Sequence, residues 1–223
     1  MSDRSHALII GASRGLGLAL ANELTRRGWH VTATTRGSGD LRASADLTIE
    51  SLEMTSPDQL TALRERLSGR RFDLLFVNAA INRGNQPIGE VPTDVFTEVM
   101  VTNALSPLRT LETLRDLVVP DGTVAIMSSD QGSISRNTEP GYELYKASKA
   151  ALNQLMRSYT TRHTGDGHTK LLIDPGHNKT ALGGPDAPLT AEESIPAVVD
   201  VLEKQAGATG LQFLDLHGEV VPW

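Results

Sequence analysis

The chain has 223 residues, of which 39% are hydrophobic, 22% charged and 4% aromatic, as in an ordinary globular protein. Its net charge of −6 argues against non-specific binding to nucleic acid or to an anionic membrane surface. The sequence has no cysteine and its six histidines are dispersed, so we expect neither disulfides nor a metal site. No apolar run is long enough for a signal peptide or a membrane span, and we therefore expect a cytoplasmic protein.

The N-terminal segment combines a strand, a glycine-rich turn and a helix. Ala7-Leu8-Ile9-Ile10 is a continuous apolar run, typical of a buried parallel strand, and a helical pattern follows the glycines. This order points backbone N–H groups and a helix N-terminus at a phosphate. Gly11, Gly15 and Gly17 are spaced G-x-x-x-G-x-G, unlike the G-x-G-x-x-G of the common dinucleotide fingerprint. A glycine-rich turn without a ligand is the alternative interpretation.

The second strand, expected at residues 31–35, ends at Arg36. In dinucleotide-binding folds a carboxylate at this position binds the ribose 2′-hydroxyl, whereas an arginine suits a 2′-phosphate. No acidic residue follows before Asp40, and Arg14 in the glycine turn is a second cation. The two arginines favour NADP over NAD, although both could instead be solvated surface residues.

The rest of the chain continues the alternation of strands and helices. Ser56 and Pro57 open one helix as cap and first residue, and a long helix is expected over 93–118, with Pro107 kinking or locally unwinding it. Further strands are expected at 47–52, 72–77, 123–127 and 170–173. With no repeat or linker, the sequence predicts one domain over 1–223, an α/β fold whose doubly wound parallel sheet has helices on both faces.

Polar or small residues follow several of these strands, where open parallel sheets bind ligands. Asn78-Ala79-Ala80 follows the fourth strand, and Ser129 follows the fifth. Tyr145 and Lys149 are four residues apart and therefore share one face of the next helix. A nearby ammonium favours the phenolate, and bringing a phenol from a pKa of about 10 to about 7 needs roughly 4 kcal/mol. Taken alone, this pair is common by chance.

Six motifs in this order and spacing resemble the short-chain dehydrogenase/reductase family, in its short carbonyl-reductase and C-factor-like branch. The resemblance covers essentially the whole chain. Each motif is weak by itself, but together they outweigh the chance interpretation of Tyr145 and Lys149. The motifs are Gly11-x-x-x-Gly15-x-Gly17, Asn78-Ala79-Ala80, Asn103, Ser129-x-x-Gly132, Tyr145-x-x-x-Lys149 and Pro175-Gly176.

The resemblance implies a Rossmann fold and an NADP(H)-dependent oxidoreductase acting on a small carbonyl or alcohol. Tyr145 would be the general acid/base, and Lys149 would hold the nicotinamide ribose and keep the pKa of Tyr145 low. Ser129 would donate a hydrogen bond to the substrate oxygen, and Asn103 would hold a water in a proton relay to Lys149. The resemblance implies cofactor contacts from Tyr145 and Lys149 and from Gly11, Ser13, Arg14, Gly15, Leu16, Gly17, Arg36, Glu53, Asn78, Ala79, Ala80, Pro175, Gly176 and Thr180.

One departure concerns the segment after Pro175-Gly176, where many relatives carry an aliphatic residue and this chain has His177-Asn178. His177 is either a polar group on the substrate side or a solvated loop residue. Polar residues at the expected substrate mouth indicate a polar or hydroxylated substrate. The resemblance also implies a homodimer or homotetramer, through the helices bearing Asn103 and Tyr145. A protein that senses or signals by binding NADP, with little or no turnover, is the alternative function.

Overall fold

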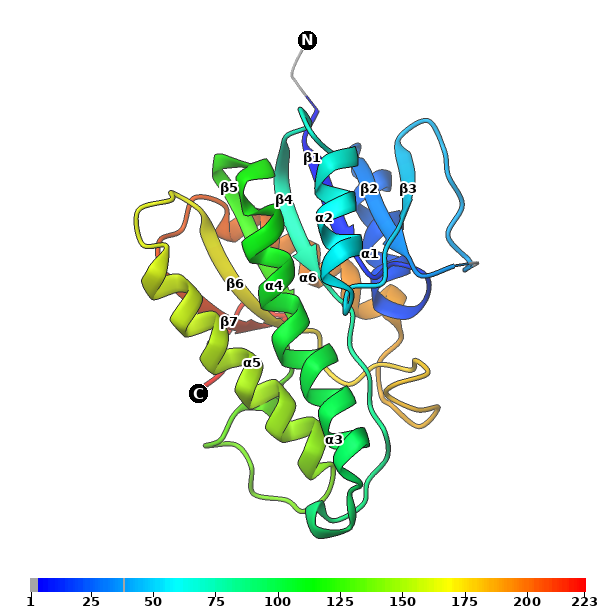
Figure 1. The fold of residues 1–223 in the computed structure, drawn as a ribbon, viewed down its shortest axis with the longest axis vertical. Coiled ribbons are helices and arrows are strands. Elements are labelled where there is room, and N and C mark those ends of the chain that lie inside the picture. Colours follow the sequence, from blue (N-terminus) through cyan, green and yellow to red (C-terminus); the bar gives the residue numbers. More distant parts are fainter. Residues whose placement is uncertain (1–3, 38) are drawn as a thin grey trace.

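The computed structural model describes residues 4–37 and 39–223, which form a seven-stranded sheet flanked by helices (Figure 1). Every pair of neighbouring strands is parallel, and the strand order is β3-β2-β1-β4-β5-β6-β7. The strands are β1 (His6–Ile10), β2 (His30–Thr35), β3 (Leu47–Ser51), β4 (Phe72–Val77), β5 (Val118–Met127), β6 (Thr169–Asp174) and β7 (Leu211–Asp215).

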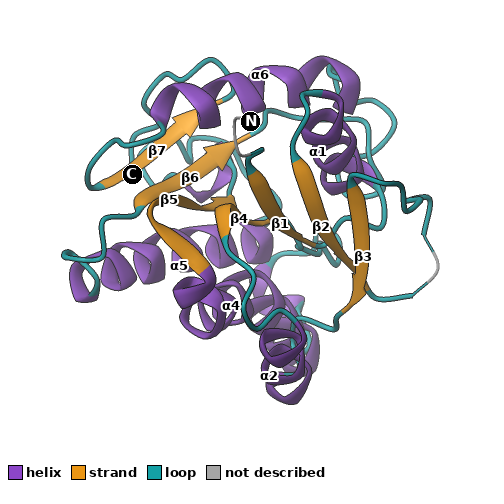
Figure 2. Cartoon of the chain, turned by 90° about the horizontal axis from the view of Figure 1, so that it is seen from above, coloured by secondary structure: helices purple, strands orange, loops and turns teal. Residues whose placement is uncertain are grey.

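Helices cover both faces of this sheet, which confirms the doubly wound fold expected from the sequence. Figure 2 shows α1 and α6 over one face and α2, α4 and α5 over the other. Successive residues of a strand point to opposite faces, so Leu8 packs in one apolar core and Ile9 in the other. The helices are α1 (Gly15–Arg26), α2 (Pro57–Arg66), α3 (Thr93–Met100), α4 (Ser106–Leu114), α5 (Glu143–Arg162) and α6 (Ala191–Gln205).

The strand order fixes where a ligand can bind. From β1 the chain adds β2 and β3 on one side, then crosses back to place β4 on the other side of β1. At such a switch point the loops leaving the two central strands diverge, which opens a crevice at the carboxyl ends of the strands. The glycine turn follows β1, and Asn78 follows β4, so both border this crevice.

The helix expected over 93–118 is present but is not uniform. A π-helical turn, Val101–Leu105, separates α3 from α4, and a 3-10 turn, Arg115–Leu117, ends the segment. Pro107 has no N–H, so the carbonyl of Asn103 cannot receive the usual hydrogen bond from the fourth residue along. The local unwinding predicted from the proline is therefore found at Asn103. In addition, β5 begins at Val118 rather than at residue 123.

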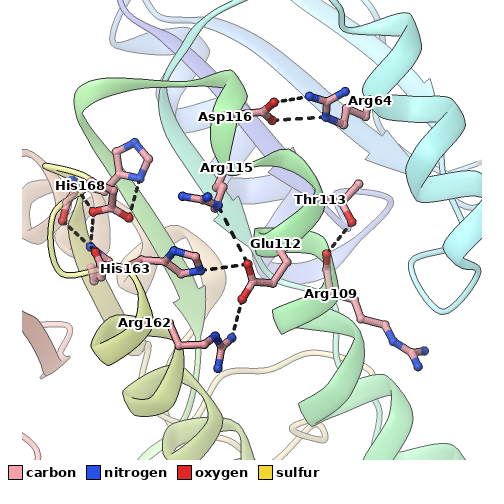
Figure 3. A network of polar contacts seen from close by, with 11 residues as sticks. Arg64, Arg109, Glu112, Thr113, Arg115, Asp116, Arg162, His163 and His168 are labelled. Atoms are coloured by element: carbon pink, nitrogen blue, oxygen red, sulfur yellow. Dashed lines mark hydrogen bonds and ion pairs between the residues drawn. The ribbon is translucent and has the colours of Figure 1, made fainter.

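Charged side chains join α4 and α5 at the opposite edge of the sheet, where β5 and β6 begin (Figure 3). Glu112 forms an ion pair with Arg162, and its Oε2 lies 3.0 Å from Nε2 of His163, within hydrogen-bonding distance. Close by, the ammonium of Lys170 pairs with Asp166, and their side chains are only 4% and 11% exposed. In the part of the chain described, no helix is both long and apolar enough to cross a membrane.

Candidate active site

A cleft of about 1210 Å³ lies at the carboxyl ends of the central strands. It brings together the glycine turn, the loops after β2, β4 and β5, the start of α5 and the segment that follows β6. Every site residue named from the sequence lines it except Gly17 and Asn103, which lie behind its wall. The chain thus places in one cleft residues that are up to 169 positions apart, from Gly11 to Thr180.

The glycine spacing is required by close packing around the end of β1. Gly11 has a φ of +87°, and a Cβ there would lie 2.8 Å from the Cβ of Ala79. A Cβ on Gly17 would lie 2.1 Å from the carbonyl oxygen of Gly11, which accepts a hydrogen bond of 2.9 Å from Asn78 Nδ2. Gly17 and Asn78 therefore shape the turn from behind.

The N-terminus of α1 suits an anion. The helix begins at Gly15, and neither a side-chain cap nor an acidic residue in the first turn engages its free N–H groups. By contrast, Ser56 caps α2 and Thr190 caps α6. A Cβ on Gly15 would lie 3.5 Å from Thr180 Cγ2, so the segment after β6 faces this N-terminus across the cleft. The turn fits the pyrophosphate of a dinucleotide.

Arg36, at the end of β2, has a partner within the chain. Its Nη1 lies 3.5 Å from Glu53 Oε2, and its side chain is 64% exposed. Glu53 also accepts hydrogen bonds from the backbone N–H and hydroxyl of Thr55, at 3.1 and 2.9 Å. Burial raises the pKa of Glu53, but these hydrogen bonds and Arg36 outweigh burial and hold it below its usual value. A 2′-phosphate here would share or replace the Arg36–Glu53 pair.

Tyr145, Lys149 and Ser129 meet at the inner end of the cleft. Lys149 is 2% exposed, and its Nζ donates a hydrogen bond of 2.8 Å to the carbonyl of Met127. The same Nζ lies 5.8 Å from the centre of the Tyr145 ring. The Ser129 hydroxyl accepts a hydrogen bond from the N–H of Gln131 at 3.2 Å. Ser129 also favours the charged form of the Tyr145 phenol, which acts to lower the pKa of that phenol.

The pKa of Tyr145 in the fold differs from the expectation that Lys149 keeps it low. Burial, followed by the negative charge of Asp174, raises the pKa of Tyr145 well above its ordinary value, and Ser129 only partly opposes this. Burial also lowers the pKa of Lys149 to about 8, with Asp174 acting in the opposite direction. In the protein without a ligand, the ammonium of Lys149 therefore does not bring the pKa of the Tyr145 phenol into the neutral range.

Asn103 is completely buried, and its side chain is occupied. Its Oδ1 accepts the N–H of Ile81 at 2.8 Å, and its Nδ2 donates to the Ile81 carbonyl at 2.8 Å and to the Ser148 hydroxyl at 3.0 Å. The side chain thus fixes the loop after β4 against α5.

Sequence reasoning missed three polar residues that shape the site from behind. Ser148 supports Asn103, and Asn153 accepts a hydrogen bond from Ser128 at 2.7 Å and donates to the carbonyl of Gly132 at 3.3 Å. Asp174, the last residue of β6, accepts the N–H of Gly176 at 3.1 Å. The available signal was a polar residue on a face that is otherwise apolar, at positions 148 and 153 of α5.

The segment after Pro175 is held by its own side chains. Asn178 Nδ2 donates to the carbonyls of Pro175 and Gly176, at 2.9 and 3.0 Å. The ring of His177 contacts the Gly183 carbonyl through Nε2 at 2.7 Å, so this exposed histidine braces a turn. Thr180 accepts the N–H of Gly183 at 3.0 Å. These contacts keep the segment close to the cleft.

Comparison with known proteins agrees with this geometry. A family model described as short chain dehydrogenase matches residues 5–188. A solved structure described as a short-chain dehydrogenase/reductase from Burkholderia multivorans with bound NADP is 51% identical, with a TM-score of 0.97, and covers 99% of this chain and 100% of that one. A carbonyl reductase from Pseudomonas aeruginosa PAO1 in complex with NADP is 36% identical, with a TM-score of 0.91 and coverage of 99% and 100%.

A curated relative, C-signal of Myxococcus xanthus, is 33% identical over 153 residues, which cover 68% of this chain and 92% of that protein. The family match spans most of the chain, and both solved structures share its fold from end to end. The chain therefore belongs to the short-chain dehydrogenase/reductase family, whose members use nicotinamide cofactors.

Proposed function

We propose that the chain is an NADP(H)-dependent oxidoreductase that transfers a hydride between the nicotinamide and a small, polar carbonyl or alcohol. The observation that carries this proposal is the convergence of Tyr145, Lys149 and Ser129 in one cleft, beside a glycine turn that fits a pyrophosphate. The NADP-bound relatives described above, one of them a carbonyl reductase, support the choice of cofactor and reaction.

The cofactor would lie along the carboxyl ends of β1, β2 and β4. The first N–H groups of α1 would hold the pyrophosphate, and Arg36 with Arg14 would hold the 2′-phosphate. Asn78 would line the adenosine ribose, and Thr180 would face the pyrophosphate from the opposite wall. When bound, NADPH supplies the hydride.

Tyr145 would donate a proton to the carbonyl oxygen during reduction, or remove one from the alcohol during oxidation. Ser129 would donate a second hydrogen bond to this oxygen, which strengthens as negative charge develops there. With a pKa of about 8, Lys149 is mostly protonated at neutral pH, so it can hold ribose hydroxyls and favour the phenolate. Each unit by which the pKa of Tyr145 falls needs about 1.4 kcal/mol of differential stabilisation.

Asn103 would contribute through its backbone. Because Pro107 cannot supply an N–H, the carbonyl of Asn103 lacks its regular helical partner. The π-helical turn widens the helix at the same place, as is frequent at functional sites. This supports a water held at the carbonyl, from which protons could pass to Lys149.

The mouth of the cleft favours a polar substrate. Asn82, Asp130 and Gln131 line it, and all three carry hydrogen-bonding groups. An apolar ketone would leave these groups without partners, which costs free energy on binding. Small ketones and aldehydes bearing hydroxyl groups are therefore the expected substrates. A screen in which only bulky apolar ketones turn over would contradict this choice.

The experiment follows NADPH oxidation, by the absorbance of the reduced nicotinamide, with a panel of carbonyl compounds. We expect Tyr145→Phe to lower kcat by at least about 100-fold while NADPH still binds, because only the proton donor is lost. Tyr142→Phe is the matched control, since Tyr142 also lines the cleft but is 47% exposed. Equal turnover by wild type and Tyr145→Phe would refute the role of Tyr145.

A second function, signalling through NADP binding without necessary turnover, is favoured by the similarity to C-signal. Under this alternative the biological output needs cofactor binding but not the phenol of Tyr145. Measuring the output of Tyr145→Phe in cells separates the two: loss of output supports the reductase, and full output supports the signalling role.

A further inference from the structure

A second, smaller cavity adjoins the cleft at Tyr145. This side pocket has a volume of about 170 Å³ and lies between the loop after β4, α3 and the start of α5, where the two helices run next to each other (Figure 1). Asn82, Arg83 and Tyr145 line both the side pocket and the cleft. The two cavities therefore meet at the residue proposed to transfer the proton. The apolar residues that line the side pocket are Val91, Pro92, Val95, Val99 and Leu144.

The walls of the side pocket suit an apolar group. Val99 from α3 and Leu144 from α5 are only 1% and 7% exposed, so they form its packed inner surface. Val91 and Val95 are half-buried and keep apolar surface that a ligand would cover. Covering such surface is favourable, and small-molecule sites are typically lined in this way, with a few polar groups beside the apolar ones.

Three contacts hold the loop after β4 in the position that forms the side pocket. Nε and Nη2 of Arg83 lie 2.7 and 2.5 Å from the two carboxylate oxygens of Glu98 on α3. Glu143, the first residue of α5, accepts the N–H of Ile88 at 3.0 Å, and Asn103 holds the start of the loop as described above. The pocket is thus formed without a ligand, so binding would not cost the ordering of this loop. Because Glu98 engages the guanidinium of Arg83, the pocket favours an uncharged group over an anion.

The size of the side pocket limits what can enter it. An apolar cavity of about 150 Å³ binds benzene, so a pocket of about 170 Å³ accommodates a phenyl ring or a branched alkyl group. A ketone carbon bears two substituents. With its oxygen at Tyr145, one substituent can enter the side pocket while the other stays in the cleft, which Asp130 and Gln131 line with polar groups.

We propose that the side pocket receives one compact, uncharged apolar substituent of the carbonyl substrate, and that Val91 and Val95 determine its permitted size. This inference rests on the proposed oxidoreductase function and narrows its substrate class. The expected substrates are ketones with a hydroxyl-bearing carbon on one side of the carbonyl and a branched alkyl or phenyl group on the other. Reduction takes the hydride of NADPH and the proton of Tyr145, and yields a diol and NADP⁺.

The test uses three hydroxymethyl ketones whose second substituent is methyl, isopropyl or phenyl. Val95→Phe places a ring in the side pocket, and kcat/KM is compared between wild type and variant for each ketone. We expect the values for the isopropyl and phenyl ketones to fall at least about tenfold relative to the methyl ketone, because one methylene in an apolar pocket already changes kcat/KM by about 10- to 200-fold. An equal loss with all three ketones, or an unchanged preference, would overturn the proposal.

Two variants complete the comparison. Thr97→Phe is the matched control, because it adds the same ring at an exposed position of α3 that lines neither cavity, and its preference should equal that of wild type. Val91→Phe fills the side pocket from the loop, and it keeps the test open if Val95→Phe does not fold. It must change the preference in the same direction, and an unchanged preference in Val91→Phe would contradict the assignment.

Failure of the underlying function has a separate signature, namely no turnover by wild type with any ketone of the panel. Binding of the corresponding diols, measured by calorimetric titration in the presence of NADP, then still reports on the side pocket. We expect wild type to bind the phenyl diol at least about tenfold more tightly than the methyl diol, and Val95→Phe to lose this difference. Equal binding of the two diols by wild type would refute the inference.

Discussion

Replacing Arg36 by alanine tests the predicted preference for NADP most directly. The guanidinium lines the cleft at the end of β2 and pairs with Glu53 at 3.5 Å. NADPH carries the 2′-phosphate that Arg36 would bind, whereas NADH carries a hydroxyl there. We therefore expect Arg36→Ala to weaken NADPH binding and to leave NADH binding nearly unchanged.

The expected size follows from the exposure and the partner of Arg36. A hydrogen bond to a charged group contributes about 1.5–3 kcal/mol, but this side chain is 64% exposed and must share or leave Glu53. The discounted value is about 1–2 kcal/mol, which corresponds to about 5- to 30-fold weaker binding of NADPH. Glu53→Gln should strengthen NADPH binding by up to about fivefold, because an exposed ion pair of at most about 1 kcal/mol no longer competes.

The assay is a calorimetric titration of wild type and Arg36→Ala with NADPH and with NADH, at one fixed salt concentration. Arg42→Ala is the control, because Arg42 is also exposed but donates to the carbonyl of Gly39 at 2.6 Å and does not line the cleft. Equal weakening of both cofactors, or the same loss in Arg42→Ala, would refute the reasoning.

Two further substitutions test the packing of the glycine turn and the charged network. Gly17→Ala places a Cβ 2.1 Å from the carbonyl oxygen of Gly11. We therefore expect a loss of about 1–3 kcal/mol in unfolding free energy, measured by urea titration, and at least tenfold weaker NADPH binding, measured by cofactor titration. Gly89→Ala is the control and should change neither quantity, because a Cβ on Gly89 meets open space. Asp166→Ala leaves the buried ammonium of Lys170 without its carboxylate, and urea unfolding should show a loss of about 3–5 kcal/mol at neutral pH. Burial raises the pKa of Asp166, but Lys170 outweighs burial and holds this pKa below the unfolded value of about 3.9. The extra stability of wild type over Asp166→Ala is therefore complete above about pH 3.9 and declines as the pH falls through the folded pKa of Asp166. A stability difference that grows on acidification would contradict this reasoning.

The fold could be predicted because its buried strands are continuous apolar runs that alternate with helical patterns. The start of β5 could not be predicted in the same way. Residues 119–122 include Pro120, Asp121 and Gly122, which favour a turn, yet Val118 pairs with Phe72 across a register shift before the regular ladder begins at Thr123. Pairing with an existing strand outweighed the local preference, and such pairing is visible only in three dimensions.

Motif spacing predicted which residues would meet in the cleft, but not their electrostatics. The expectation that Lys149 lowers the pKa of Tyr145 considered one pair on one helix. In the fold, burial of both groups and the charge of Asp174 act on that pair as well. Asp174 comes from a strand 25 residues further along the chain, so helical spacing gave no sign of it.

The π-helical turn at Val101–Leu105 has a consequence for how this region tolerates changes in length. A π-turn holds one residue more than an α-turn, so deleting one residue there would restore a continuous α-helix. Because the wider turn absorbs the additional residue, this deletion would remove the bulge that carries Asn103 and leave α3 and α4 close to their present orientations. Asn103 could then no longer face Ile81 while both flanking helices kept their packing. A shortening that leaves the helix regular would thus separate the loop after β4 from α5.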